Sequence, residues 1–419
     1  MNSIQIQPSC ADPSEPDSLS VEEALQRIQT QLPTIETCEY LSLRDALGRV
    51  LAAPIISPIN VPAHVNSAMD GYAIAAADLP STGMQTLDVI GSAWAGKSFA
   101  GVVARRQCVR IMTGAVMPLG TDTVLMQEHV EVHGTQIRFM AGEKAGQNVR
   151  QAGEDLALGQ VVLEAGKYLN PAELGLLASL GIVEVQVKRR LRVAFFSTGD
   201  ELCSVGQTLG EGQVYDSNRY TLFGMLQRLG VEVLDMGVVR DQREALQQAL
   251  SSAAAQADVI ISSGGVSVGE TDFTKQVLNE LGQINFWKIA MKPGRPLAFG
   301  QVHGRAFFGL PGNPVAVMVT FYQFVQPALR TMQGSAYENL LFKARSLSAF
   351  KKKPGRTEFV RAHFEKLENG EWQVQRSGEQ GSGILRSMSE ANCFIVLPRL
   401  QGDVAQGDWV EVQAFVGLV

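Results

Sequence analysis

The pattern of apolar and polar positions changes several times along the chain. Residues 1–18 are polar and rich in proline and serine, which is typical of a flexible tail. The next residues, SVEE from Ser20, form a capping box ahead of apolar residues at helical spacing, so a helix is predicted here. From residue 55 to 165, short strand-like runs are separated by turns that contain glycine with asparagine or aspartate. This stretch predicts a β domain, either a barrel or a sandwich.

After a helical stretch at 171–182, strand patterns alternate with helix patterns from residue 190 onward. The runs LRVAFFS and DVIIS are typical of buried strands, whereas 217–230 and 241–256 have helical spacing. Such alternation predicts a parallel sheet with helices on both faces. Short strand patterns return after residue 340, and they predict a separate small β domain at the end of the chain.

Composition excludes several classes of protein. With 45% apolar residues, the 419-residue chain has enough apolar surface for several cores, so it is not a largely disordered protein. A net charge of −6 without a long basic run argues against a nucleic-acid partner. No apolar run is long enough for a membrane span, and the five cysteines form no C-x-x-C pair. We therefore expect a soluble, cytoplasmic protein with neither a membrane nor a nucleic acid as partner.

Five clusters of small and polar residues carry the candidate chemistry. They are NSAMDGY (66–72), RIMTGA (110–115), FFSTGDEL (195–202), SSGGVSVGETD (262–272), and KPGRP (292–296) together with LPGNP (310–314). Taken singly, the first two are more typical of ordinary turns or strand ends. The 262–272 loop follows a strand and opens a helix, so its backbone N–H groups and the helix dipole favour phosphate-type binding. It lacks the P-loop and dinucleotide-binding fingerprints.

Charged residues gather at the predicted strand ends of the α/β region. The acids are Glu201, Asp241 and Asp272, and the cations are Lys288, Lys292 and Arg295. Ligands bind at the carboxyl edge of an open parallel sheet. Cations there can hold oxyanions, and carboxylates can hold Mg²⁺ against phosphate oxygens. The residues alone therefore predict a site for a phosphorylated or pyrophosphate-bearing ligand.

Taken together and in this order, the motifs resemble the molybdopterin molybdenumtransferase family, which is MoeA in bacteria and the gephyrin E domain in animals. The resemblance runs from Ser20 to Val419 and implies a multidomain α/β plus β fold. Its parts are a tail (1–18), a split helical domain (19–56 and 153–188), an inserted β domain (57–152), a molybdopterin-binding-type α/β domain with a mostly parallel sheet (189–338), and a C-terminal β-barrel-like domain (339–419).

The same resemblance implies an enzyme of molybdenum cofactor biosynthesis. The family inserts molybdate into the dithiolene of adenylylated molybdopterin and releases AMP, with Mg²⁺ as the divalent cation. Family members form homodimers, and a transient contact with the preceding adenylyltransferase is a further expectation. The dithiolene sulfurs belong to the substrate, so the reaction needs no cluster of protein cysteines.

Matched motif by motif, the resemblance also implies functional residues. The catalytic positions are Asp70, Thr113, Asp155, Glu201, Asp241 and Asp272, of which the last three also hold the metal. The substrate-binding positions are Thr198, Ser263, Gly264, Gly265, Ser267, Gly269, Lys288, Lys292, Arg295, Pro311, Gly312, Asn313, Pro314, Arg361 and Ser382. Three positions depart from the family: His64 and Val65 stand where an aromatic residue and an acid are frequent, and Arg295 stands where lysine is common.

Each group has an expected role. The loop 264–269 and the turn 310–314 are expected to hold the terminal phosphate and the pterin. Lys288, Lys292, Arg361 and Ser382 are expected to attract molybdate, while Asp70 and Thr113 of a partner subunit complete the pocket.

Two other functions remain open from the residues. One is a nucleotide pyrophosphatase or deamidase that uses the same α/β domain, although the two β domains argue against it. The other is a non-catalytic molybdopterin-binding scaffold, although the full set of acidic and basic positions argues against lost catalysis.

Overall fold

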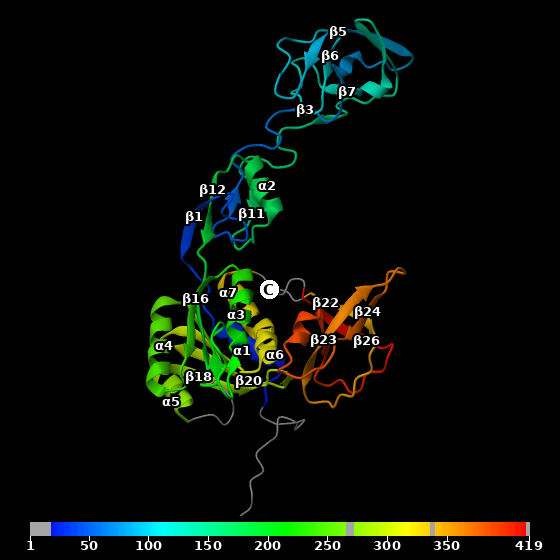
Figure 1. The fold of residues 1–419 in the computed structure, drawn as a ribbon. Helices are drawn as coiled ribbons and strands as arrows, with labels where there is room; N and C mark the ends of the chain where they lie inside the picture. The colour runs from blue at the N-terminus through cyan, green and yellow to red at the C-terminus, as the bar shows by residue number, and fades with distance from the viewer. Residues whose placement is uncertain (1–17, 265–271, 336–339, 416–419) are drawn as a thin grey trace, which may run out of the picture. The chain divides into compact units, whose positions relative to one another are not determined.

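The computed structural model describes residues 18–264, 272–335 and 340–415 (Figure 1). Two compact units are present, one formed by residues 40–187 and the other by the described residues on either side of that stretch. Within the described residues no helix is long and apolar enough to cross a membrane.

The inserted β domain is built on one six-stranded sheet in the order β7-β4-β6-β5-β9-β8. Its strands are β4 (Gly71–Ile74), β5 (Met84–Ala93), β6 (Gln107–Ile111), β7 (Thr123–Met126), β8 (Glu131–His133) and β9 (Gln136–Met140), with short 3-10 turns η1 (Ala76–Asp78) and η2 (Gln127–His129). Neighbouring residues face opposite cores: Tyr72 and Ile74 pack in one cluster, and Ala73 in another. The described strands form an open sheet rather than the predicted barrel or sandwich, with a core on each face.

The split domain is assembled from segments on both sides of this insertion. Its elements are β1 (Cys38–Ser42), β2 (Ile55–Ile56), β11 (Val161–Leu163), α2 (Pro171–Ser179) and β12 (Glu184–Lys188). The short strands β3 (Asn66–Ser67) and β10 (Val149–Arg150) pair with each other and belong to the inserted domain. Ala46 and Leu51 from the first segment pack with Leu169, Leu177 and Val187 from the second. This core joins residues that lie more than a hundred positions apart in the sequence.

The α/β domain contains a six-stranded sheet in the order β16-β13-β17-β21-β20-β18. Its strands are β13 (Arg192–Thr198), β16 (Glu232–Val239), β17 (Val259–Ser263), β18 (Gly282–Lys288), β20 (Pro296–Val302) and β21 (Arg305–Leu310). The first four strands in the order are parallel, and β20 runs antiparallel to both of its neighbours. The predicted mostly parallel sheet is therefore confirmed.

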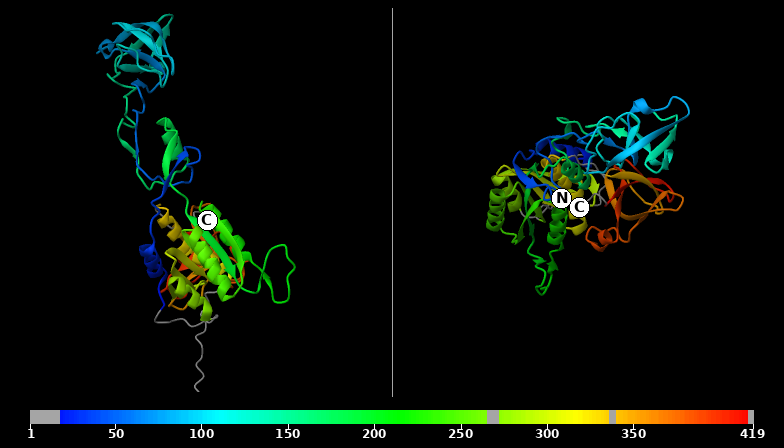
Figure 2. Two further views of the ribbon diagram at one scale, coloured as in Figure 1. Left: turned by 90° about the vertical axis from the view of Figure 1, so that its left-hand side faces the viewer. Right: turned by 90° about the horizontal axis from the view of Figure 1, so that it is seen from above.

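Helices cover both faces of this sheet (Figures 1 and 2). They are α1 (Val21–Gln31), α3 (Ser217–Arg228), α4 (Arg243–Gln256), α5 (Asp272–Leu281), α6 (Pro314–Thr320), the π-helical segment η3 (Phe321–Val325) and α7 (Gln326–Met332). Phe195 points to the face shared with α1, α3, α6 and α7, and Phe196 points to the face shared with α4 and α5. Alternating strand residues thus build two cores on one sheet.

Helix α1 begins at the predicted capping box, but it packs on the α/β domain instead of the split domain. The Glu23 N–H donates to Ser20 Oγ at 3.1 Å, and the Ser20 N–H donates to Glu23 Oε2 at 2.8 Å, which confirms the capping box. Its buried residues Ala24 and Ile28 lie in the α/β core. The expected boundary at residue 19 grouped this helix with the split domain, whereas its apolar face is covered by the α/β domain.

The C-terminal domain is a closed five-stranded barrel, orange to red in Figure 1. Its strands are β22 (Leu341–Ser346), β23 (Thr357–Lys366), β24 (Trp372–Arg376), β25 (Cys393–Leu397) and β26 (Trp409–Ala414), with helix α8 (Arg386–Ser389). The ring closes because β23 pairs with both β24 and β25. The short strand β19 (Met291–Lys292), from the α/β domain, adds to β23. The predicted barrel-like domain is confirmed.

Candidate functional site

Three parallel strands end at the same edge of the α/β sheet, where the predicted site residues follow them. Strands β13, β17 and β21 end at Thr198, Ser263 and Leu310. The chain leaves β13 toward β16 on one side, whereas β17 leads on to the other half of the sheet. Such a switch in strand order opens a crevice at the carboxyl ends of the strands, the general position of ligand sites in α/β sheets.

Gly264 joins the three strand ends. Its N–H donates to the Leu310 carbonyl at 3.2 Å, and its φ of +89° lies in the region that side chains rarely adopt. A Cβ atom at this position would lie 2.5 Å from the Thr198 carbonyl oxygen. Glycine is therefore required by both its backbone conformation and its surroundings. Gly265, Ser267 and Gly269 of the same predicted loop lie outside the described residues.

Asn218 links two of these loops and was missed by sequence reasoning. Its Nδ2 donates to Ser263 Oγ at 3.0 Å and to the Gly312 carbonyl at 2.7 Å. Its Oδ1 is buried and has no hydrogen-bond partner among the described residues, and the same holds for the hydroxyls of Ser197 and Thr198. Buried polar atoms without partners are rare and cost about 1–3 kcal/mol each, so three together indicate a ligand-binding surface. The sequence signal that could have indicated Asn218 is its side-chain amide in the first turn of α3, a helix whose start lies beside the site.

Acidic side chains lie next to this surface. The Asp241 N–H donates to Asp200 Oδ1 at 3.3 Å. Burial and the negative charges of Asp200 and Glu201 raise the pKa of Asp241 above its ordinary value. Carboxylate oxygens that repel one another are the ligands that Mg²⁺ prefers, so the donor set fits a divalent cation. Among the side chains that the structure describes, no three metal-ligating groups converge. The side chain of Asp272, the third predicted ligand, lies outside the described set.

Replacing Asp241 with asparagine should stabilise the protein at neutral pH. A raised pKa means that folding favours the neutral form, so wild type loses stability as the pH rises through that pKa. The neutral amide does not repel Asp200 and Glu201, and the partly exposed site limits the gain to about 0.5 kcal/mol. Urea unfolding measures this gain, which should shrink as the pH falls toward 3.8, the ordinary value for aspartate. The exposed Asp403→Asn variant is the control and should lose stability, because Lys351 lowers the pKa of that acid.

The cationic segment connects the sheet to the barrel. Lys288 ends β18, whose direction matches that of β21, so it lies at the same edge as Thr198. Lys292 Nζ lies 3.6 Å from Glu358 Oε2, opposite it in the β19–β23 pair. A Cβ on Gly294 would lie 2.6 Å from Thr320 Oγ1, so glycine allows this segment to pack directly on α6. The segment is thereby held between the helix and the barrel.

Arg361 is a buried cation that has no carboxylate partner among the described residues. Its side chain is 1% exposed, its Nε donates to Ser387 Oγ at 3.1 Å, and one terminal nitrogen donates to the Gly381 carbonyl at 3.0 Å. Burial lowers the pKa of Arg361 to about 10, and no ion pair with an acid offsets that cost. A buried charge without a counter-charge is costly unless something else compensates it. Arg361 thus adds positive potential and orders the loop that leads to Ser382.

The ordered loop lies at the start of α6. The Val315 N–H, in the first turn of that helix, donates to the Ser382 carbonyl at 3.0 Å. Pro311, Gly312, Asn313 and Pro314 immediately precede this contact, and Pro314 begins α6. Gln323 of η3, the segment that follows α6, forms a buried hydrogen bond of 2.8 Å with Gln413 of the barrel. The structure therefore brings the predicted barrel residues to the turn that follows β21.

The remaining predicted residues lie in the unit of residues 40–187. Asp70 Oδ1 accepts hydrogen bonds from the Thr113 N–H and from Thr113 Oγ1, each at 2.7 Å. These bonds hold the pKa of Asp70 below its ordinary value, so it is ionised at neutral pH. Asp155 is exposed, and its N–H donates to the Val61 carbonyl at 3.0 Å. The structure thus brings the motifs at 66–72 and 110–115 together, and the roles of all three residues stay predictions.

Three family descriptions match consecutive parts of the chain. They are "MoeA N-terminal region (domain I and II)" at residues 19–181, "Probable molybdopterin binding domain" at 194–331, and "MoeA C-terminal region (domain IV)" at 343–415. A Haemophilus influenzae protein named molybdopterin molybdenumtransferase is 47% identical over 401 residues, which cover 95% of this chain and 98% of that protein. The chain belongs to the MoeA family.

Other members of the MoeA family and its relatives agree with this assignment. The solved structure of a molybdopterin biosynthesis MoeA protein from Pyrococcus horikoshii is 29% identical, with a TM-score of 0.83 over 95% of this chain and 100% of that one. A Dictyostelium discoideum protein named gephyrin is 32% identical over 93% of this chain and 61% of its own length. The predicted MoeA resemblance and multidomain α/β plus β fold class are both confirmed.

Proposed function

We propose that the protein inserts molybdate into the dithiolene of adenylylated molybdopterin, releasing AMP and forming molybdenum cofactor. The observation that carries this proposal is Arg361, which is buried, has no acidic partner in the part of the chain that the structure describes, and holds the loop that contacts the first turn of α6. An oxyanion substrate would supply the missing negative charge. The names of the relatives support the same reaction class, since several are molybdopterin molybdenumtransferases.

The strand-end loops are suited to hold the organic substrate. Gly264 and the turn after Leu310 offer close backbone approach at the edge of the sheet, where the terminal phosphate is expected. Asn218 Oδ1 is a free acceptor for a ring N–H or amino group, which the pterin has in plenty. Lys288, Lys292 and Arg295 add the positive charge that draws phosphate and molybdate toward this edge.

Glu201 and Asp241, with Asp272, would hold Mg²⁺ at the adenylyl phosphates. The cation would supply Lewis acidity and a template for the phosphate oxygens. Asp200 contacts the Asp241 N–H and repels its carboxylate, so it would help to raise the affinity of the site for a cation. Because Asp241 must be ionised for this, Mg²⁺ affinity should increase as the pH rises through its raised pKa.

We also infer a homodimer, in which Asp70 and Thr113 of one subunit complete the pocket of the other. Six apolar side chains between residues 205 and 223 support a protein contact because they are exposed in the single chain. They are Val205, Leu209, Val214, Tyr215, Tyr220 and Phe223. Exposed apolar groups concentrated in one segment are typical of an interface. A transient contact with the adenylyltransferase that makes the substrate, and a cytoplasmic location, belong to the same proposal.

The test measures AMP release from adenylylated molybdopterin with Mg²⁺, with and without molybdate. The product is then added to a molybdenum-free apoenzyme whose activity reports finished cofactor. We expect molybdate-dependent AMP release and apoenzyme activation. The Lys292→Ala variant should lose about 10²-fold in rate, in the range for removing one group that stabilises developing charge. Lys343→Ala, an exposed lysine on the barrel strand β22, is the matched control and should match wild type.

Each alternative function gives a different result in this assay. Tight substrate binding without turnover would favour the scaffold. Hydrolysis of unrelated nucleotides without a need for molybdate would favour the pyrophosphatase or deamidase. Wild-type turnover in Lys292→Ala would refute the assignment of that cation.

A further inference from the structure

A cavity of about 180 Å³ lies at the opposite edge of the α/β sheet from the proposed active site. Its wall includes Asp258, which immediately precedes β17, and Arg305, which begins β21. The carboxyl ends of the same two strands, Ser263 and Leu310, carry the site described above. The rest of the wall comes from the end of α1 and the segment that follows it (residues 31–37), from Arg189, from the sheet and its turn (Phe299, Gly300, Gln301, Gly304 and Ala306), and from Met332 of α7.

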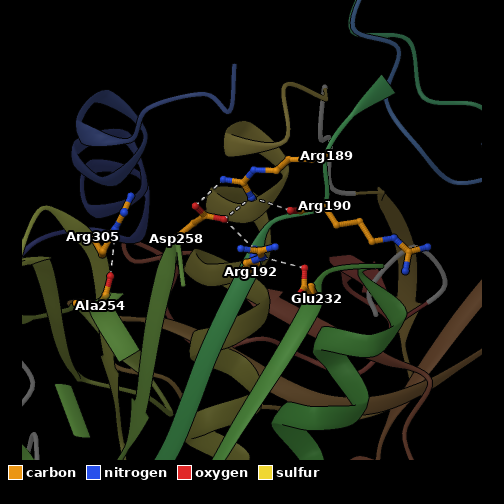
Figure 3. A network of polar contacts seen from close by, with 7 residues as sticks. All are labelled: Arg189, Arg190, Arg192, Glu232, Ala254, Asp258 and Arg305. Atoms are coloured by element: carbon orange, nitrogen blue, oxygen red, sulfur yellow. Dashed lines mark hydrogen bonds and ion pairs between the residues drawn. The ribbon is translucent and has the colours of Figure 1, made fainter. Parts of the chain in front are cut away.

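Two acids at this edge are already neutralised by arginines (Figure 3). Both carboxylate oxygens of Asp258 accept from Arg189, at 2.7 and 2.8 Å, and the Arg192 N–H donates to the same carboxylate at 2.9 Å. The Arg192 Nε donates to Glu232 at 3.0 Å. Burial opposes ionisation of Asp258, yet these bonds and the charges of Arg189 and Arg305 hold its pKa below the ordinary value. Asp258 and Glu232 are therefore committed to Arg189 and Arg192.

Arg305 keeps its terminal nitrogens free. Its Nε donates to the Ala254 carbonyl at 3.3 Å, and neither terminal nitrogen has a partner among the described residues. Figure 3 shows the side chain extending away from Ala254, at the sheet edge that also holds the Arg189–Asp258 pair. Glu36, the other acid on the cavity wall, is exposed and forms no ion pair with Arg305 in the described part of the chain. A free planar guanidinium fork matches the two oxygens of a carboxylate.

The cavity's size and remaining wall restrict the ligand. A volume of 180 Å³ is about that of six water molecules, and it is below the roughly 300 Å³ at which drug-sized pockets begin. Adenylylated molybdopterin is therefore too large for it. Leu32, which is half-buried, and Pro33, which is exposed, contribute apolar surface to the same wall as the arginine. Apolar surface next to a cation suits an organic anion better than a bare inorganic one.

We propose that this cavity binds a small organic carboxylate, with its oxygens on Arg305 and its carbon skeleton against Leu32 and Pro33. The site is distinct from the active site, since the two lie at opposite ends of β17 and β21. Both can therefore be occupied at the same time. The proposal does not depend on the function assigned to the carboxyl edge.

The test is calorimetric titration of the full-length protein with benzoate, whose ring and carboxylate match the two parts of the wall. We expect saturable, millimolar binding to wild type. Arg305→Gln should weaken it by about ten-fold or more, the effect of losing a charge-assisted hydrogen-bonded pair. Arg190→Gln removes a neighbouring arginine that does not line the cavity, so it should bind benzoate as wild type does. Because Arg305 is exposed, its variant should retain the thermal midpoint of wild type.

Inorganic phosphate is titrated in parallel, so that binding of an organic carboxylate can be distinguished from binding of any small anion. Benzoate binding that depends on Arg305 and survives in Lys292→Ala supports the proposal. Phosphate binding with the same dependence, without benzoate binding, would overturn the organic part of it. Equal benzoate affinity in wild type and Arg305→Gln, or no saturable binding to wild type, would overturn the site itself.

Discussion

Replacing Arg361 with methionine is expected to reduce molybdate-dependent AMP release by about 10²- to 10³-fold, the range for removing one electrostatic stabiliser from a buried site. Methionine fills most of the same space but carries no donors, so the Gly381 carbonyl loses its arginine donor and Ser387 Oγ keeps only its bond to the Ile384 carbonyl. Each loss costs about 1–3 kcal/mol, partly offset because a cation no longer has to be buried. Rates at increasing molybdate and urea unfolding would measure the two effects separately.

A second substitution separates charge from geometry at this position. Arg361→Lys keeps a positive charge, but an ammonium group cannot reach the hydroxyl and the loop carbonyl in the same planar arrangement. It should bind molybdate better than Arg361→Met and still turn over more slowly than wild type. Arg376→Met, an exposed arginine of strand β24, is the control for removing a cation from the barrel. Wild-type rates in Arg361→Met would contradict the proposed oxyanion site.

Replacing Gly264 with alanine is expected to abolish measurable substrate binding, with affinity falling by at least about 10²-fold. The new Cβ would lie 2.5 Å from the Thr198 carbonyl oxygen, so the ends of β13 and β17 must move apart. The φ of +89° adds a backbone cost of about 1 kcal/mol for any residue with a side chain. We expect the free energy of unfolding to fall by about 2–4 kcal/mol in total, including local overpacking. Equilibrium binding of adenylylated molybdopterin and urea unfolding test the two expectations.

Gly230→Ala is the matched control for this change. Gly230 follows α3 at a φ of +70°, and an added Cβ there meets no atom within 4 Å. It carries the backbone cost without the collision, so it should lose about 1 kcal/mol and keep its substrate affinity. If both alanine variants bound substrate like wild type, the loop at 264 would not be part of the binding site.

Local features of the fold could be predicted well because they depend on near neighbours in the chain. The capping box at Ser20 and Glu23 spans four residues and formed as expected. The alternation of Phe195 and Phe196 between two cores follows from the two-residue period of a strand. We expected α1 to pack in the split domain, but it packs on the α/β domain. An apolar helix face indicates burial without indicating which surface covers it.

At the candidate site too, locally encoded features could be predicted and long-range contacts could not. The glycine-rich and charged motifs were visible because their residue types point to phosphate and cation chemistry on their own. Asn218 was missed, since its two partners lie 45 and 94 positions away in the sequence. Arg361 entered only through the family resemblance. Nothing near it in the chain indicates that its guanidinium is buried and binds a loop up to 26 residues further on.

The sequence by itself predicted a β region, then a mostly parallel α/β region and then a final small β domain, and the order of its motifs indicated the family. These follow from periodicity, turn residues and motif order, which short stretches of chain carry. Only the tertiary structure decided that the Ser382 loop contacts the first turn of α6, that Asn218 joins two loops, and that Arg305 faces a cavity at the far edge of the sheet. Each of these contacts joins residues far apart in sequence, and packing of whole elements brings such residues together.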